Sequence, residues 1–449
     1  MTSSYQLSRR QLFAAAFASV AGFSFDLFDL FVLLFVASTI GPLLFPSSQP
    51  TLSLAAVYGS FAVSLIMRPV GSFAFGPHAD RIGRKRLMII TISGVGLATA
   101  LMGAVPTYAQ AGAAAPAAFL FLRLVQGLFV GGVVASTHTI ATESIPEKWR
   151  GLMSGIISGG AAAFGAVVAS VADLVIHIFF PGSAFGAWGW RIMFYLGIFG
   201  ALLSFFVLRA VEESPLWRQQ VQSAAPARAP VKTLFRRRYL GVVLLNLVVV
   251  SGAGAQYYLT SGYLPTFFAK INGLSGTVTS RFLIWDSLVF LISTLLVGHL
   301  SEHIGRKKTF LLTGAVNIVA LPVLYWQLSS LGSASTYTIL ACSLLLVFFS
   351  NAAYAPVLIF LNERFPTAVR STGTAFCWNG GFAIGGLMTT FVSLASPTIA
   401  DIPSRLIFFL IGWIVIFIIA ILASPETRGR LTGLGSEQGI GAVPLTGGT

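Results

Sequence analysis

Three aspartates lie inside long apolar stretches of this 449-residue chain, where an ionised carboxylate has no bulk water around it. Asp26 and Asp29 are three residues apart, so in a helix both side chains lie on the same face. Two carboxylates this close do not both ionise cheaply, and one of them can take up a proton. Asp286 stands in a later stretch. The pattern predicts proton coupling at Asp26, Asp29 and Asp286, with helix packing as the alternative for Asp286.

Two arginines in other apolar stretches are the cationic counterparts of these acids. Twelve residues separate Arg68 from Asp80, which corresponds to about 18 Å of helix and places Arg68 near mid-membrane. Arg123 lies in the outer half by the same reasoning. A guanidinium group matches the geometry of a carboxylate, so each arginine either holds an anionic substrate or exchanges partners with Asp29. The alternative is an ion pair that only joins two helices.

Polar and aromatic side chains at intermediate depth are further candidates to line a substrate cavity, with packing as the alternative. We predict substrate contacts at Gln126, Gln256, Tyr257, Tyr258, Tyr263, Asn351, Tyr354, Trp378 and Asn379. Gly262 and Pro265 lie close to four of them, so we expect a bend in that helix.

The composition is that of an integral membrane protein. Hydrophobic residues make up 55% of the chain and charged residues 9%, whereas a soluble domain has about 25% charged residues. The net charge of +14 does not point to nucleic acid, because the basic residues are confined to short loops between apolar segments. Most of them fall on one side of the expected membrane, which predicts an inner-membrane protein with both termini in the cytoplasm.

Twelve apolar segments are long enough to cross a bilayer about 30 Å thick, so we predict an all-α membrane fold. They are residues 12–40, 54–77, 87–106, 116–143, 151–178, 190–210, 239–269, 277–301, 309–330, 337–363, 371–396 and 404–424.

Two loop patterns recur about half a chain length apart, which indicates two copies of one six-helix unit. The acid and Ile-Gly-Arg-Lys core at Asp80 returns at Glu302, 222 residues later, and the Glu, Pro and Arg pattern at 143–150 returns at 363–370. We therefore expect two pseudo-symmetric bundles with the function between them. Their predicted bounds are 1–210 and 239–429, with a cytoplasmic linker at 211–238 and a disordered tail at 430–449.

The charged residues of these repeated loops lie at the predicted cytoplasmic helix ends, where acids and arginines can pair. We predict a gate that stabilises the outward-open state, with setting the membrane orientation alone as the alternative. Its members are Asp80, Arg84, Glu143, Arg150, Glu302, Arg306, Glu363 and Arg370.

Together these motifs resemble the major facilitator superfamily, whose fold has twelve transmembrane helices in two pseudo-symmetric six-helix bundles. The resemblance rests on Gly76-x-x-x-Asp80-Arg81-x-Gly83-Arg84-Lys85 and its second copy, on Pro146-Glu147-x-x-Arg150-Gly151 and on Pro425-Glu426-Thr427-Arg428-Gly429. Arg68-Pro69-x-Gly71 and Asp26-Leu27-Phe28-Asp29 are similar to motifs of its metabolite:proton symporter branch, which includes dicarboxylate, α-ketoglutarate and proline-betaine permeases. Val133 departs from that branch, which usually has an acid after the paired glycines.

The resemblance implies alternating-access symport of a small organic acid or related metabolite with protons, by a functional monomer. Three alternatives stay open: an exporter of organic anions or drugs by proton antiport, uptake of a zwitterionic osmolyte or aromatic acid, and a transporter-like receptor.

The expected partners are a small-molecule substrate, protons and the lipid bilayer, with no nucleic acid. We expect no enzyme, because no nucleotide-binding glycine loop with a following Lys-Ser/Thr is present and acids, His and Cys do not cluster at catalytic spacing. Cys342 and Cys377 both lie in apolar segments, so neither a metal site nor a cofactor is expected.

Overall fold

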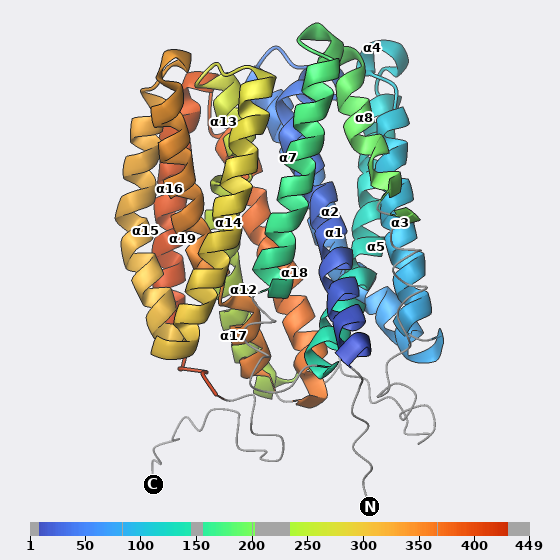
Figure 1. Ribbon diagram of the computed structural model, residues 1–449, viewed down its shortest axis with the longest axis vertical. Helices are drawn as coiled ribbons and strands as arrows, with labels where there is room; N and C mark the ends of the chain where they lie inside the picture. Colours follow the sequence, from blue (N-terminus) through green and yellow to red (C-terminus); the bar gives the residue numbers. More distant parts are fainter. Residues whose placement is uncertain are drawn as a thin grey trace, which may run out of the picture.

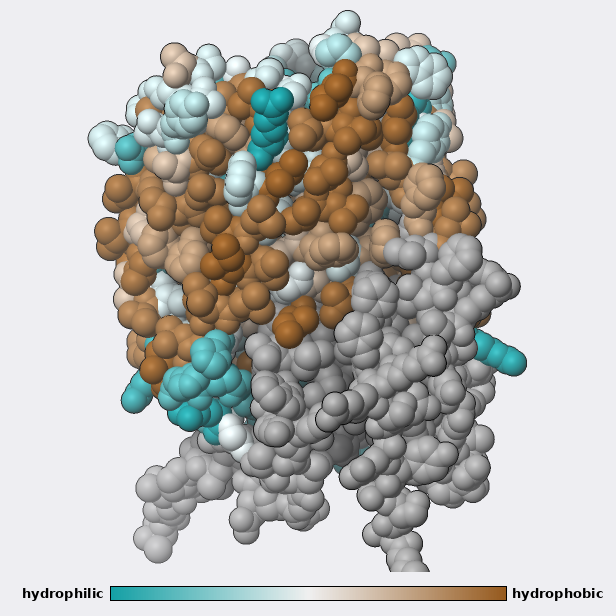
Figure 2. Space-filling model, in the orientation of Figure 1, coloured by the Kyte–Doolittle hydropathy of each residue, from teal (hydrophilic) through white to brown (hydrophobic). Residues whose placement is uncertain are grey.

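The computed structural model is a bundle of long helices that run roughly side by side (Figure 1). It describes residues 9–82, 84–144, 156–199, 201–202, 234–365 and 367–429, and these contain no β-strand. Within them, ten helical segments are long and apolar enough to cross a membrane. Apolar side chains cover the middle of the face shown in Figure 2, and hydrophilic residues gather toward its two ends.

The N-terminal half is built by the helices before residue 203. They are α1 (Arg9–Leu44), α2 (Pro50–Ile82), α3 (Arg84–Ala104), α4 (Tyr108–Ala111), α5 (Ala114–Ser144), the π-helical turn η2 (Ile156–Gly160), α7 (Ala161–Phe179), the π-helical turn η3 (Phe185–Gly189) and α8 (Trp190–Tyr195).

The C-terminal half begins with α12, two residues before the predicted bound of 239. Its helices are α12 (Arg237–Leu259), α13 (Leu264–Lys270), α14 (Gly276–Ile304), α15 (Arg306–Ser329), η4 (Ser333–Ser335), α16 (Thr336–Tyr354), α17 (Val357–Arg364), α18 (Thr367–Leu394), η5 (Ile399–Asp401) and α19 (Ile402–Ala423). Most of the predicted linker and the whole predicted tail lie outside the described residues.

The helix over 239–269 is interrupted, as the sequence predicts. Helix α12 ends at Leu259 and α13 begins at Leu264, with Pro265 in its first turn. Proline has no N–H group to give to the preceding turn, so the first turn of a new helix suits it.

Two pairs of helices form most of the contact between the halves: α2 packs against α18, and α7 packs against α14. We call the end of the bundle nearest the labelled N and C ends of the chain the inner end, and the opposite end the outer end (Figure 1). Toward the outer end, the hydroxyl groups of Tyr58 and Thr266 are 2.8 Å apart, and Ser280 Oγ donates to Asp173 Oδ2 at 2.6 Å. Both hydrogen bonds join one half to the other.

Candidate functional site

Asp29 is the centre of a buried polar cluster that joins three helices of the N-terminal half. Its Oδ1 accepts a hydrogen bond from Thr99 Oγ1 on α3 at 2.5 Å, and its Oδ2 accepts one from Gln126 Nε2 on α5. The Asp29 side chain on α1 is buried, so these two donors replace water and fix the orientation of the carboxylate.

Gln126 connects this carboxylate to Arg123, one turn earlier on α5. Arg123 Nη1 donates to Gln126 Oε1 at 2.6 Å, and the guanidinium carbon lies 5.4 Å from the centroid of the Phe119 ring. Arg123 is only 1% exposed, yet its Nε and Nη2 atoms have no hydrogen-bond partner. A buried guanidinium with two unused donors is suited to receive a carboxylate.

Arg68 on α2 adds a second buried cation to this cluster. Its charge interacts with the charge of Arg123 and also acts on the hydroxyl group of Tyr257, which belongs to the other half of the molecule. Asp29, Arg68, Arg123 and Gln126 are thus brought together, next to the interface between the halves. The side chains of Asp26 and Val133 lie outside the described residues.

Four of the predicted aromatic and polar liners meet in one cluster of rings in the C-terminal half. The ring centroids of Tyr257 lie 4.9 Å from Tyr258 and 5.5 Å from Tyr354, and Tyr354 lies 5.5 Å from Trp378. Phe31 of α1 touches the same cluster, with its centroid 6.4 Å from that of Tyr257. The rings therefore lie directly across the interface from the Asp29 cluster.

The remaining predicted liners make contacts elsewhere. Gln256 Oε1 accepts a hydrogen bond from Asn317 at 2.7 Å, so it joins α12 to α15. Tyr263 stacks on Tyr58 toward the outer end, with ring centroids 5.1 Å apart. Asn351 Nδ2 lies 3.0 Å from Ser261 Oγ, and the buried amide of Asn379 has no hydrogen-bond partner at either atom.

Asp286 lies apart from the Asp29 cluster, on α14. It lines a cavity of about 20 Å³ whose walls come from both halves.

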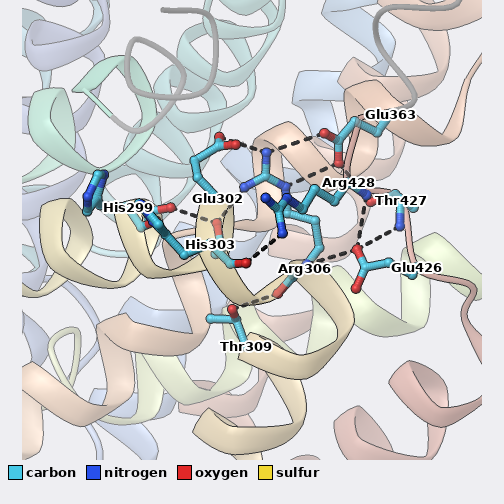
Figure 3. A network of polar contacts seen from close by, with 12 residues as sticks. His299, Glu302, His303, Arg306, Thr309, Glu363, Glu426, Thr427 and Arg428 are labelled. Carbon is cyan, nitrogen blue, oxygen red and sulfur yellow. Dashed lines mark hydrogen bonds and ion pairs between the residues drawn. The ribbon is translucent and has the colours of Figure 1, made fainter. Parts of the chain in front are cut away.

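A second polar network closes the inner end of the C-terminal half around Arg306 (Figure 3). The guanidinium group forms ion pairs with Glu302 at 2.7 Å and with Glu363 at 3.2 Å, and Nη1 donates to Ser301 at 2.6 Å. Arg306 is 2% exposed, so its charge depends on these carboxylates. The network joins the ends of α14, α15 and α17.

Glu426, which follows α19, caps the first turn of α15 in this network (Figure 3). Its carboxylate accepts hydrogen bonds from the backbone N–H groups of Arg306 at 2.9 Å and Lys307 at 3.1 Å. Partial burial alone raises the pKa of Glu426, but the N–H groups of Arg428, Arg306, Thr427 and Lys307 outweigh burial and lower it. Gly305, the residue just before α15, has a φ of 97°, a conformation that favours glycine. A Cβ atom at this position would lie 2.5 Å from Glu426 Oε2.

Of the other predicted gate residues, Arg370 is the only one with a described side chain, and its Nε donates to the backbone oxygen of Phe365 at 3.1 Å. Asp80, Arg84, Glu143 and Arg150 have side chains outside the described residues. Among the predicted gate residues, the ion pairs that are described form within the C-terminal half.

Two residues of these networks, Thr99 and Glu426, were not among the predicted site residues. Thr99 is a single hydroxyl group in an apolar helix, with no sequence signal for its partner. Glu426 belongs to the Pro425–Gly429 motif, which was used above only as evidence for the family resemblance. Its position just after a helix end, where a carboxylate can reach free N–H groups, is the signal that would have assigned it.

Residues 12–376 match the model of the Major Facilitator Superfamily. The chain is 30% identical to a putative proline/betaine transporter of Staphylococcus haemolyticus, over 84% of this chain and 80% of that protein. It is 27% identical to the alpha-ketoglutarate permease of Escherichia coli, over 94% and 96% of the two chains.

Solved structures agree on the fold. A crystal structure of a D-xylose-proton symporter superimposes with a TM-score of 0.73 at 18% identity, covering 93% of this chain and 99% of that chain. No group of three or more metal-binding side chains is present in the described part of the chain. The predicted all-α membrane fold is therefore confirmed, and the chain belongs to the Major Facilitator Superfamily of membrane transporters, not to an enzyme family.

Proposed function

We propose that this protein is a proton-coupled symporter that imports a small metabolite with a carboxylate group by alternating access. It acts as a monomer in the inner membrane, with both termini in the cytoplasm. The observation that carries the proposal is the buried Asp29 carboxylate, linked through Gln126 to Arg123. The names of the relatives, a proline/betaine transporter and an alpha-ketoglutarate permease, support a carboxylate-bearing substrate.

The proposed cycle uses the two charges of this cluster in sequence. Asp29 takes up a proton from outside, which weakens its electrostatic hold on Arg123. The substrate carboxylate then binds Arg123, whose two unused donors replace the lost interaction, and Arg68 is a second cation beside it. The halves rock about the interface, and both the substrate and the proton are released inside. The ion pairs of Arg306 with Glu302 and Glu363 stabilise the inner end of the C-terminal half during this motion.

The proton gradient is sufficient to drive accumulation. A membrane potential of 100 mV is worth about 2.3 kcal/mol for each net positive charge that enters with the substrate, or about 50-fold accumulation. A proton antiporter that exports organic anions remains the second candidate, because it uses the same two kinds of charge.

Uptake into proteoliposomes tests the proposal, with a panel of organic acids and zwitterions and with or without an imposed pH gradient. Symport predicts accumulation only when the outside is acidic. Asp29→Asn should lose this accumulation but keep exchange of labelled for unlabelled substrate, because exchange needs no net proton movement. Asp401→Asn, at an exposed carboxylate, should behave like the wild type. Uptake that ignores the gradient, or full accumulation by Asp29→Asn, contradicts the proposal.

A further inference from the structure

The C-terminal half contains a second buried carboxylate that the proposed cycle does not use. Asp286 on α14 is 4% exposed, and neither of its carboxylate oxygens has a hydrogen-bond partner. Asp29, by contrast, accepts hydrogen bonds from two donors. A buried carboxylate without donors is costly, so Asp286 needs either a proton or a bound cation.

In the described part of the chain, no positively charged side chain pairs with Asp286. Helix α7 carries His177, but its Nδ1 lies 3.4 Å from an oxygen of Asp173 on its own helix. Lys270 of α13 and Arg281 of α14 are exposed. The bases of α15 lie in its first turn at the inner end, and α16 carries no charged residue. The positive charge must therefore come from outside the protein.

Two serines next to Asp286 have already committed their hydroxyl hydrogens. Ser287 Oγ donates to the backbone oxygen of Leu283 at 2.6 Å. Ser343 of α16 lies beside the carboxylate, and its Oγ donates to the backbone oxygen of Leu340 at 2.9 Å. Each hydroxyl has one hydrogen and two lone pairs, so both serines can still accept but no longer donate.

A group of oxygens without a free donor suits a hard cation, which takes oxygen ligands. Such a site needs neither cysteine nor histidine. The expectation of no metal site rested on the two cysteines, so it does not bear on a site of this kind.

Asp286 and Ser287 line the cavity of about 20 Å³, which has room for one water molecule and thus also for a sodium ion, which is smaller. Ser261, in the break between α12 and α13, belongs to the same wall. The Ser261 carbonyl lies four residues before Pro265, which has no N–H group to donate to it. Carbonyl groups freed by a helix break are ligands for sodium ions in membrane transporters.

One carboxylate among neutral oxygens matches a cation with a single charge. The other walls of the cavity are apolar, with Phe31 and Phe35 from the N-terminal half and Phe290 from the C-terminal half. A divalent ion would leave one positive charge uncompensated in these surroundings, whereas a sodium ion and Asp286 neutralise each other. A proton would satisfy one carboxylate oxygen but would not fill the cavity.

We propose that Asp286 binds a sodium ion in the interface between the halves, with Ser261, Ser287 and Ser343 as further oxygen ligands. Because the walls of the cavity come from both halves, the affinity for the ion depends on how the halves are arranged. Sodium is then a second coupling ion, and an inward sodium gradient contributes to uptake. The site is additional to the proton site proposed at Asp29 and does not depend on it.

The test measures sodium binding to the purified full-length protein in detergent, without substrate and without a pH gradient. Radioactive sodium is titrated by equilibrium dialysis at constant pH, with choline chloride holding the ionic strength constant. The melting temperature is followed in the same series. Neither substrate nor proton movement enters the measurement, so failure of the proposed symport cycle does not affect the result.

The wild type should bind one sodium ion per molecule, and its melting temperature should rise with sodium. Potassium is larger, so about tenfold more of it should be needed for the same rise. Asp286→Asn should lose both the binding and the rise. In choline chloride this variant should nevertheless melt no lower than the wild type, because it removes an uncompensated buried charge.

Two further variants complete the comparison. Ser287→Ala keeps the carboxylate but removes one ligand, so it should weaken sodium binding by about tenfold. Asp401→Asn should bind sodium as the wild type does.

Absence of saturable sodium binding by the wild type overturns the proposal without any variant. Equal stabilisation by sodium, potassium and choline also overturns it, because the effect would then be one of ionic strength. Full sodium binding by Asp286→Asn has the same consequence. So does a melting temperature that depends on pH through Asp286 but not on sodium, because the carboxylate would then take up a proton.

Discussion

Replacing Gly127 with alanine tests whether the close contact of α2 and α5 keeps the Asp29 cluster in shape. A Cβ atom at Gly127 would lie 2.2 Å from the backbone oxygen of Ser64, whereas ordinary contacts begin at 3.4 Å, so the two helices must separate by about 1.2 Å there. The obstacle is a backbone atom, so no change of side-chain rotamer relieves it. The helices themselves have to move.

Two opposing effects determine how much Gly127→Ala lowers the free energy of unfolding. Overpacking of this kind costs about 1–3 kcal/mol, and the higher helix propensity of alanine returns at most about 1 kcal/mol. We expect a net destabilisation of about 1–2 kcal/mol. The function should suffer more, because Ser64 Oγ is already 3.4 Å from Gln126 Oε1 and further separation breaks that hydrogen bond. A displacement near 1 Å in a binding site can cost about 100-fold in rate.

The melting temperature of the purified variant and its uptake rate in proteoliposomes measure the two effects. The control is Gly412→Ala on α19, where a Cβ would meet no atom within 4 Å. The control should melt at or slightly above the wild-type temperature and transport normally. Equal melting temperature and uptake for the two variants would contradict this account of the helix contact.

Two further predictions concern the inner end of the C-terminal half. Glu363→Gln leaves the Arg306 charge buried with only the partly exposed Glu302 as its partner, so we expect a loss of up to about 3–5 kcal/mol in stability, measured by denaturation. Unchanged stability would show that Glu302 alone compensates Arg306. Glu426→Gln should lower the melting temperature above about pH 5, because a carboxyl group whose pKa is lowered on folding stabilises the folded state above its unfolded pKa. That difference should vanish as the pH falls through the folded pKa, and a difference that grows in acid would contradict the capping role.

Sequence alone predicted helices such as α14 because membrane spans are set by composition and length. The segment predicted at 277–301 is found as α14, Gly276–Ile304, and the bend near Gly262 is found between Leu259 and Leu264. Apolar runs and proline act locally, so their effects can be read without knowing any neighbour.

Partnerships across helices could not be predicted in the same way. Depth in the membrane follows from counting residues, but the direction in which a side chain points depends on how each helix is rotated in the bundle. Asp29 and Thr99 are 70 residues apart and meet, whereas Gln256, predicted as a liner, turns to Asn317. The pairing of Arg306 with acids could be predicted, because the repeated motif places these residues at helix ends on the same side of the membrane.

The two hydrogen bonds that close the outer end, from Tyr58 to Thr266 and from Ser280 to Asp173, are single contacts between neutral donors and their acceptors. The bond between neutral hydroxyl groups contributes about 0.5–1.5 kcal/mol and the bond to the carboxylate about 1.5–3 kcal/mol, so together they favour closure by about 2–4.5 kcal/mol, or roughly 30- to 2,000-fold in population. A bound metabolite shifts this balance only by the difference between its affinities for the two arrangements of the halves. A substrate that binds one arrangement more tightly by that factor is then enough to decide which side of the membrane its site faces.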